Sequence, residues 1–515
     1  MGAELPGAFT ALQAHHFPLF LTMTRLLELL DAVLPVHFFT GRSELDKVGF
    51  AEFAASFWPR MAEALRHRLQ PLVVYGEIVT FIKGGSAAVR TPGTGRLSRE
   101  RYCALAQGRR STLNEEERGH VYTMFERYEQ LKAERGQWDQ CDAVSHVYQY
   151  LEQMPARGRE ALAKLARVYV DEVQDLTEAE ITLLRFLCPD VDRGFVLAGK
   201  IALQPSITRL GSVECWLLIC ERLPFLHPAG DTAQTIARGV GFRFERVREL
   251  FFTDFLGADK SKGMPPLFTL TANYRTHDGV LRVGNLLVKM LLQYFPHEVD
   301  KLPEETGQLH GPRPLFVNEV TVAELAVVLF GGDPASMTAE TPSELGAAQV
   351  ILVREDSDRD VLLQGSPLAT SQILTILESK GLEFDDVIIY NFFDRSIMTS
   401  ADWRVVYGFF QHLELPAEDR EAEPFPRFEE GRHRLLCSEL KALYVAVTRA
   451  RRQLIFYDGS LPTRKPLREL LLRMRAVRAV ASADYKGCGI AQYSTPEEWH
   501  AEGRKYFASE MVSCT

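Results

Sequence analysis

One segment in the first half of the chain constrains the fold more than any other. A short apolar run, 168–170, ends in the acidic pair Asp171 and Glu172, a helix signal begins at Thr177, and 195–197 is a second apolar run. A strand, an acidic turn, a helix and a strand in this order are typical of an α/β sheet. The chain is therefore expected to be an α/β protein.

The acidic pair also has a chemical interpretation. A carboxylate at the end of a buried strand can hold Mg²⁺ through oxygen, so Asp171 is a candidate metal ligand. The neighbouring Glu172 can activate water as a general base for phosphoryl transfer. The alternative is a strand-end turn with no chemistry, and this segment alone favours neither.

Helical patterns dominate residues 1–165. The clearest stretches are 50–70 and 115–134, and the second has two plausible N-caps, Ser111 and Asn114. We expect this part of the chain to be mostly helical.

A second α/β block covers 267–460. Its predicted strands are 350–353, 387–390 and 454–457, and the acidic, proline-containing segment 411–432 is expected to be a surface insertion. Beyond this block, 464–478 mixes basic residues with leucines. Two alternatives remain for it: a solvated helix face that packs through its leucines (Leu467, Leu470 and Leu471), or a nucleic-acid contact.

Composition excludes some functions. The net charge of −9 rules out a uniformly basic nucleic-acid-binding surface but not a local basic channel. The eight cysteines include no CxxC pair, which favours reduced thiols in an intracellular protein of the nucleus or cytosol. The apolar segment 17–39 contains Arg25, Glu28 and Asp31, so it predicts an amphipathic helix and no membrane partner.

Three further segments carry charged residues beside a turn or a strand end. They are 270–275, 375–384 and 443–450, and each contains an Arg, Lys or Glu. Guanidinium groups suit the stabilisation of charge on a transferring phosphoryl group.

Taken in order, the four segments resemble the motifs of UvrD/Rep-type helicases of superfamily 1. The resemblance implies two RecA-like P-loop NTPase domains, the first one incomplete, with helical N-terminal and C-terminal additions and ATP between the two domains. The implied division is 1–165 helical, 166–260 the remainder of the first domain, 261–460 the second domain, and 461–515 a helical tail.

The resemblance also assigns catalytic roles. It implies that Asp171 and Glu172 hold Mg²⁺, that Glu172 is the catalytic base, and that Gln174 couples hydrolysis to movement. Gln234 belongs to a further catalytic motif of the family.

The nucleotide-binding residues follow in the same way. Arg275 and Arg449 would reach the γ-phosphate of ATP, and Glu383, beside Gly381, would contact the ribose. The family activity is ATP hydrolysis coupled to translocation on, or unwinding of, nucleic acid.

Other phrases, at 381–387, 390–393 and 494–499, resemble large tetratricopeptide- and ankyrin-repeat proteins with a helicase-like core. The resemblance implies that 494–499 begins helical repeats that bind protein partners. Thr495 is predicted to cap a helix, with Pro496 in its first turn. We expect the sequence to be a fragment, cut off near the start of these repeats.

The family pattern breaks in two places in the first domain. The sequence contains no GxxxxGK followed by Ser or Thr, the loop that cradles the phosphates of ATP. The glycines of 91–98 imitate one, but Arg96 and Leu97 replace the lysine and the hydroxyl. The Gln234 motif is split by an insert, 200–230, for which a translated retained intron and a genuine loop both remain open. Catalysis by this chain is therefore expected to be impaired.

A third departure concerns nucleic acid. Leu377 stands where related helicases usually have His, so DNA or RNA contact is expected to be weakened, in line with the negative net charge. The alternative function is a catalytically inactive, helicase-like interaction scaffold.

Overall fold

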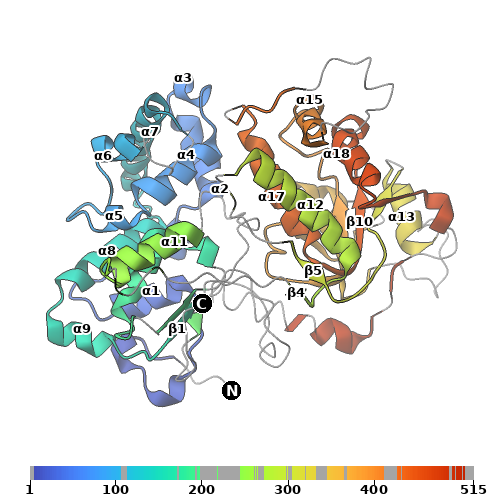
Figure 1. Cartoon of the computed structure of the whole chain (residues 1–515). Coiled ribbons are helices and arrows are strands. Elements are labelled where there is room, and N and C mark those ends of the chain that lie inside the picture. Colours follow the sequence, from blue (N-terminus) through green and yellow to red (C-terminus); the bar gives the residue numbers. More distant parts are fainter. Residues whose placement is uncertain are drawn as a thin grey trace. The chain divides into compact units, whose positions relative to one another are not determined.

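The computed structural model describes residues 5–105, 113–170, 173–191, 194–197, 217–218, 244–259, 261, 264, 272–296, 299, 304–318, 321–331, 345–364, 368–369, 371–410, 426–430, 432–485, 490–492, 494–501 and 503–504. The described residues up to 264 form one compact unit, and those from 272 onward form a second. Each unit is described by itself (Figure 1).

The first unit contains a small sheet with the strand order β2-β1-β3. Strands β1 (Val168–Val170) and β2 (Phe195–Leu197) are parallel, and β3 (Leu217–Leu218), part of the predicted insert, runs antiparallel to β1. The helix after the acidic turn, α10 (Glu178–Leu183), begins with the expected capping box between Thr177 and Glu180. The predicted strand-turn-helix-strand order is confirmed.

Helices make up most of the rest of this unit. The α-helices are α1 (Met23–Asp31), α2 (Phe50–Glu52), α3 (Glu63–Arg66), α4 (Pro71–Glu77), α5 (Ser86–Val89), α6 (Arg99–Ala104), α7 (Glu115–Glu134), α8 (Gln140–Gln153), α9 (Ala156–Leu162) and α11 (Phe244–Leu250). The prediction for 115–134 is confirmed, and Asn114 is the cap, because its side chain accepts the Glu117 N–H.

The predicted helical stretch 50–70 is largely helical, but it is divided into several short elements. After α2 the chain forms a π-helix (Phe53–Phe57) and a 3₁₀ turn (Trp58–Arg60), and an α-helix resumes only at α3. Pro59 lies in the 3₁₀ turn and has no backbone N–H to donate, so it cannot continue the i to i−4 hydrogen bonds.

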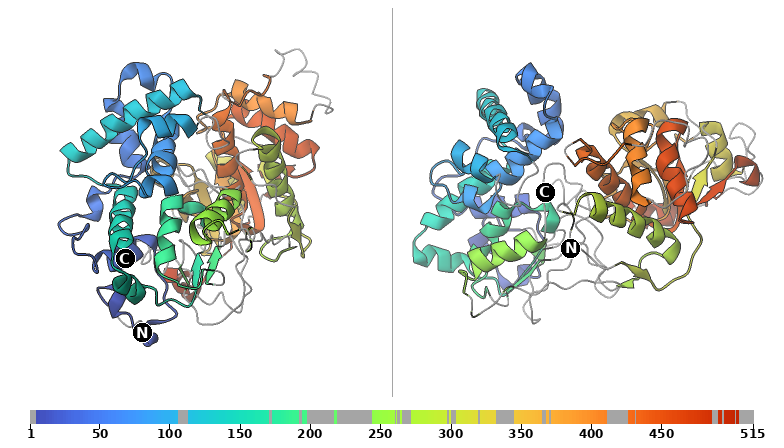
Figure 2. Two further views of the ribbon diagram at one scale, coloured as in Figure 1. Left: turned by 60° about the vertical axis from the view of Figure 1, so that its left-hand side comes forward. Right: turned by 45° about the horizontal axis from the view of Figure 1, so that its top comes forward.

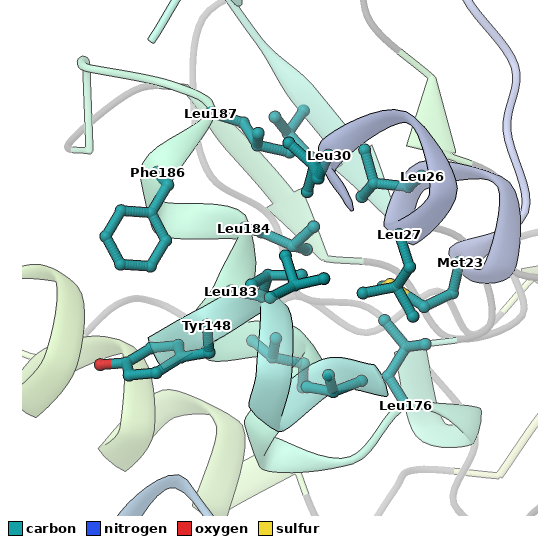
Figure 3. Close-up of a cluster of buried hydrophobic side chains, with 14 of the residues drawn as sticks. Met23, Leu26, Leu27, Leu30, Tyr148, Leu176, Leu183, Leu184, Phe186 and Leu187 are labelled. Carbon is teal, nitrogen blue, oxygen red and sulfur yellow. The ribbon is translucent and has the colours of Figure 1, made fainter. Parts of the chain in front are cut away.

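The N-terminal helices share a core with the sheet. Figure 3 shows the leucines of α1 directed toward the leucines of α10 and the turn after it. Leu26, Leu27, Leu183 and Leu184 are fully buried in this cluster. A separate cluster, built on Phe53, Phe57, Tyr128 and other side chains of 48–131, forms a second helical core.

The second unit contains a six-stranded sheet with the order β11-β6-β10-β9-β7-β8, in which every described pairing is parallel. Its strands are β6 (Leu315–Val317), β7 (Gln349–Val353), β8 (Ile373–Thr375), β9 (Phe384–Tyr390), β10 (Ala450–Tyr457) and β11 (Arg478–Val480). All three predicted strands of this block lie within β7, β9 and β10. The chain is therefore a mixed α/β protein with parallel sheets, as expected.

The described part of this unit also contains α-helices. They are α12 (Asp278–Tyr294), α13 (Val322–Phe330), α14 (Asp356–Leu363), α15 (Ser400–Trp403), α17 (Arg434–Val447) and α18 (Leu461–Arg473). Alternate strand residues such as Ile388 and Ile455 pack with α13, and α12 and α17 contact β10 and lie side by side (Figures 1 and 2). A short pair, β4 (Ala272–Asn273) and β5 (Thr306–Gly307), precedes this sheet in sequence.

The basic stretch of α18 packs as a helix face. Leu467, Leu470 and Leu471 are buried, which confirms the packing alternative for its leucines. Arg464 is also buried, and it donates hydrogen bonds to the carbonyl oxygens of Val317 and Asp458. At least one of these basic residues therefore serves the core of the unit.

The predicted helix cap at Thr495 is confirmed. Thr495 Oγ1 accepts the Glu498 N–H at 3.2 Å, and the Glu498 carboxylate accepts the Thr495 N–H at 2.9 Å. Among the described residues, no helix is both long and apolar enough to cross a membrane.

Candidate functional site

The predicted site residues are only partly described. Asp171, Glu172 and Gln234 lie outside the described residues, as does the side chain of Gln174. The second unit supplies the rest, and there the structure brings together the segments 273–277, 379–384 and 449–452.

The first segment is a turn that presents Arg275. The side-chain oxygen of Asn273 accepts the backbone N–H groups of Arg275 and Thr276 at 2.9 and 3.1 Å. The amide nitrogen of Asn273 donates to Glu305 at 2.5 Å. Asparagine favours such turns because its short side chain replaces a backbone acceptor. The turn leaves the Arg275 side chain 23% exposed.

The second segment follows β8 and leads into β9. The Glu378 carboxylate accepts the Thr375 N–H at 2.7 Å and closes a turn. Gly381 has a φ of +79°, a left-handed conformation that a Cβ would strain. The turn then delivers Glu383 at the start of β9, with a side chain that is 40% exposed.

The third segment begins with Arg449, whose side chain is completely buried. Its Nε donates to the Val445 carbonyl at 3.0 Å, and its Nη1 donates to the carbonyls of Leu382 and Ser379 at 3.1 and 3.4 Å. Its Nη2 donates to Thr448 Oγ1 at 3.1 Å. The guanidinium therefore holds the turn that carries Gly381.

A β-bulge follows Arg449 on β10. Between two matched pairs of residues β10 carries one residue more than β9, at Arg451 and Arg452. The two side chains lie 3.5 and 3.6 Å from the carboxylate of Asp385 and remain 46% and 61% exposed. The bulge therefore adds two guanidinium groups at the start of β10.

An ion pair joins the first two segments. Arg275 Nε lies 2.5 Å from Glu383 Oε2. The residues predicted to contact phosphate and ribose thus contact each other. The partly exposed guanidinium groups of Arg275, Arg451 and Arg452 are donors that fit an anionic polyphosphate, and Glu383 is an acceptor that fits a hydroxyl group.

Sequence reasoning missed the residues that connect these segments. Thr276 and His277 donate to the backbone of the bulge, at Arg451 and Arg452. The only signal was local: a His before the Asp-Gly start of a helix is a plausible N-cap. The bonding partners lie 175 residues away in sequence, so the chain gives no short-range pattern for them.

Two exposed apolar side chains accompany the site segments. Tyr274, beside Arg275, is 69% exposed, and Leu377, in the turn after β8, is 52% exposed. Both are available to a ligand of the second unit.

The first unit contains a group of carboxylates with metal-like spacing: Glu129, Asp139 and Asp142. The ammonium groups of Lys83 and Lys132 fill it, with N–O distances between 2.6 and 3.1 Å to all three carboxylates. Burial opposes the ionisation of Asp139, but the ammonium groups of Lys132 and Lys83 outweigh it and hold its pKa well below the usual range. The group is a buried salt-bridge network.

Comparison with known proteins identifies two regions of the chain. Residues 97–199 match the UvrD/REP helicase N-terminal domain, and residues 351–458 match the UvrD-like helicase C-terminal domain. The first match ends just after β2, and the second covers β7 to the end of β10, including Glu383 and Arg449.

Two curated relatives are similar over longer stretches. Human "TPR and ankyrin repeat-containing protein 1" is 30% identical over 96% of this chain and 18% of its own length. An ATP-dependent helicase/nuclease protein of Natranaerobius thermophilus is 26% identical over 39% of this chain and 13% of its own length. The chain thus spans less than a fifth of either relative.

Proposed function

We propose a function from the premise that this chain carries the N-terminal and C-terminal domains of UvrD-like helicases. The chain binds ATP with Mg²⁺ and belongs to a protein that couples ATP hydrolysis to movement on, or unwinding of, nucleic acid. The observation that carries the proposal is the convergence of 273–277, 379–384 and 449–452 in one unit, with the guanidinium of Arg275 at the surface.

The chemistry divides between two sets of residues. In the proposal Asp171 and Glu172 hold Mg²⁺, which neutralises the phosphate charge, and Glu172 takes the proton from the attacking water. Arg275 stabilises the charge that develops on the γ-phosphate. Gln174 couples hydrolysis to movement, and Gln234 is a further catalytic residue.

Hydrolysis by residues 1–515 is slow in this proposal. A P-loop supplies backbone N–H groups and a lysine that cradle the β- and γ-phosphates, and this sequence contains no such segment. Arg275 and its neighbours then bind the triphosphate without that support, so affinity for ATP is low.

Single-stranded nucleic acid is the polymer along which the protein is proposed to move. Leu377 is exposed in the turn after β8, but an aliphatic side chain offers no ring on which a base can stack. Contact therefore depends on the backbone phosphates and weakens steeply with salt.

One observation favours a second function, a catalytically inactive scaffold. The guanidinium of Arg449 is buried and donates to the turn at 379–382. It cannot contact a phosphate unless that turn moves. In a scaffold Arg449 would be purely structural, and protein partners would bind through helical repeats, which the name of the human relative includes.

Equilibrium binding of ATP with Mg²⁺ tests the proposal. We expect weak, saturable binding to the chain, reduced about tenfold or more by Arg275→Ala, because a charge-assisted hydrogen bond to phosphate is lost. The matched control is Arg282→Ala, an exposed arginine of α12 that donates to the Arg475 carbonyl. Equal affinity in wild type and Arg275→Ala would support the scaffold instead.

A further inference from the structure

Two buried side chains connect the segment of Arg275 to the segment of Arg449. Thr276 Oγ1 lies 3.2 Å from the carbonyl oxygen of Arg451. His277 Nε2 lies 2.7 Å from the carbonyl oxygen of Arg452. Only 4% of Thr276 and 7% of His277 is exposed, so water competes little for these bonds.

The tautomer of His277 follows from its partners. Its Nδ1 accepts the backbone N–H of Gly279 at 3.1 Å, as the N-cap of α12. Its Nε2 faces a carbonyl and must carry the proton. The ring therefore caps a helix with one nitrogen and donates to the bulge with the other.

The surroundings leave the ring little freedom. A Cβ at Gly311 would lie 2.2 Å from the His277 ring, and a Cβ at Gly279 would lie 2.1 Å from the Pro312 carbonyl oxygen. Both positions lack the space for any larger residue. The observed position of the His277 ring therefore requires glycine at both 279 and 311.

The carbonyl groups that accept these hydrogen bonds belong to a β-bulge. Arg451 and Arg452 form the bulge, where the regular β9–β10 ladder is interrupted. Bulges leave backbone groups without ladder partners. Thr276 and His277 use the carbonyl groups of this bulge, which begins two residues after Arg449.

We propose that Thr276 and His277 are positioning residues, which fasten the Arg275 turn to the bulge so that Arg275 and Arg449 keep a fixed spacing. The proposal deepens the proposed function and rests on it, because it assigns these residues to the placement of Arg275 on the γ-phosphate. Neither residue touches the nucleotide itself.

The test uses two variants that each remove one donor and a third that keeps it. Thr276→Val keeps the side-chain shape and loses the hydroxyl, and Thr276→Ser restores it. His277→Asn keeps an acceptor for the Gly279 N–H, since Asn is a strong N-cap, and loses the donor to Arg452. The four proteins are compared by their affinities for ADP and ATP with Mg²⁺, measured as displacement of a fluorescent ADP.

We expect wild type and Thr276→Ser to prefer ATP over ADP. Thr276→Val and His277→Asn should reduce this preference about three- to tenfold at unchanged ADP affinity, because only the γ-phosphate contact of Arg275 is misplaced. A purely structural role would weaken both nucleotides together or neither. Either of those results would overturn the proposal.

Failure of the proposed function gives a different result, a wild-type chain with no preference for ATP. In that case hydrogen exchange of the nucleotide-free chain decides whether the fastening exists. Backbone amides of 274–279 should exchange faster in Thr276→Val and His277→Asn than in wild type and Thr276→Ser. Unchanged exchange would overturn the fastening itself.

Discussion

Arg275 and Glu383 form an ion pair in which Nε and Oε2 are 2.5 Å apart. The two residues lie on different segments, and the family resemblance gives them different parts of the nucleotide. In this structure the Arg275 Nε–H group and the Glu383 carboxylate are therefore engaged with each other. In the proposed function, a phosphate group and the Glu383 carboxylate therefore compete for the guanidinium of Arg275.

The first prediction concerns this competition. Glu383→Gln should bind inorganic tripolyphosphate about two- to fivefold more tightly than wild type, because a partly exposed carboxylate no longer competes for Arg275. Tripolyphosphate has no ribose, so loss of a ribose contact cannot enter the result. Isothermal titration measures it. The control is Glu304→Gln, which breaks the surface pair with Lys289, and equal affinity in both variants would contradict the competition.

The second prediction separates structure from chemistry at Arg449. Arg449→Ala should lower the free energy of unfolding by about 2–4 kcal/mol, because the carbonyls of Ser379 and Leu382 lose a buried donor and a cavity remains. Urea unfolding of the second unit measures it. Arg282→Ala should cost less than about 0.5 kcal/mol. A stability loss as small as that of Arg282→Ala would show that the buried contacts of Arg449 are dispensable.

The third prediction concerns the buried network of the first unit. Asp139→Asn should destabilise the protein by about 3–5 kcal/mol at neutral pH, since it removes the most buried of the three carboxylates, which both Lys83 and Lys132 contact at 2.6 and 2.7 Å. Asp142→Asn, whose side chain is 25% exposed, should cost less. The order of the two unfolding midpoints in urea checks this, and the reverse order would refute the central place of Asp139.

The lowered pKa of Asp139 also predicts how the stability of the protein changes at low pH. Because its folded pKa lies below the unfolded value of about 3.9, its contribution is present above pH 4 and is lost as the pH falls through the acid range. Asp139→Asn should therefore lose less stability than wild type between about pH 5 and pH 2. If the stabilities of wild type and Asp139→Asn fell in parallel with pH, the lowered pKa of Asp139 would be contradicted.

The fourth prediction concerns Asp458, whose contribution to stability changes with pH in the opposite direction to that of Asp139. Burial raises its pKa to about 6, although the backbone N–H groups of Ser460, Asp394 and Phe393 act against the rise. Its contribution is full below about pH 4, the unfolded value, and disappears as the pH rises through 6. Wild type should lose about 2–3 kcal/mol over this range relative to Asp458→Asn. If the stability of Asp458→Asn fell with pH as steeply as that of wild type, the prediction would be refuted.

Local patterns predicted much of the fold. The capping box at Thr177, the cap at Asn114 and the cores of β7, β9 and β10 depend on residues within a few positions of each other. Such signals are readable because propensity, capping and alternation act over short distances. The division of 50–70 into short elements is also a local effect, because Pro59 lies in its 3₁₀ turn.

The connections within the site could not be predicted. The bonds from Thr276 and His277 reach a bulge 175 residues away, and the bulge exists only because β9 and β10 pair out of step. The burial of Arg449 likewise depends on the position of the 379–382 turn. Tertiary packing decides these features, and neighbouring residues carry no trace of them.

Turnover of ATP by the chain, with and without single-stranded nucleic acid and in parallel with Glu172→Gln, tests the central claim most directly. The account predicts slow hydrolysis by wild type, an increase with nucleic acid, and loss of both in Glu172→Gln, because the catalytic base is removed. Equal turnover in wild type and Glu172→Gln, or none in either protein at saturating ATP, would contradict it.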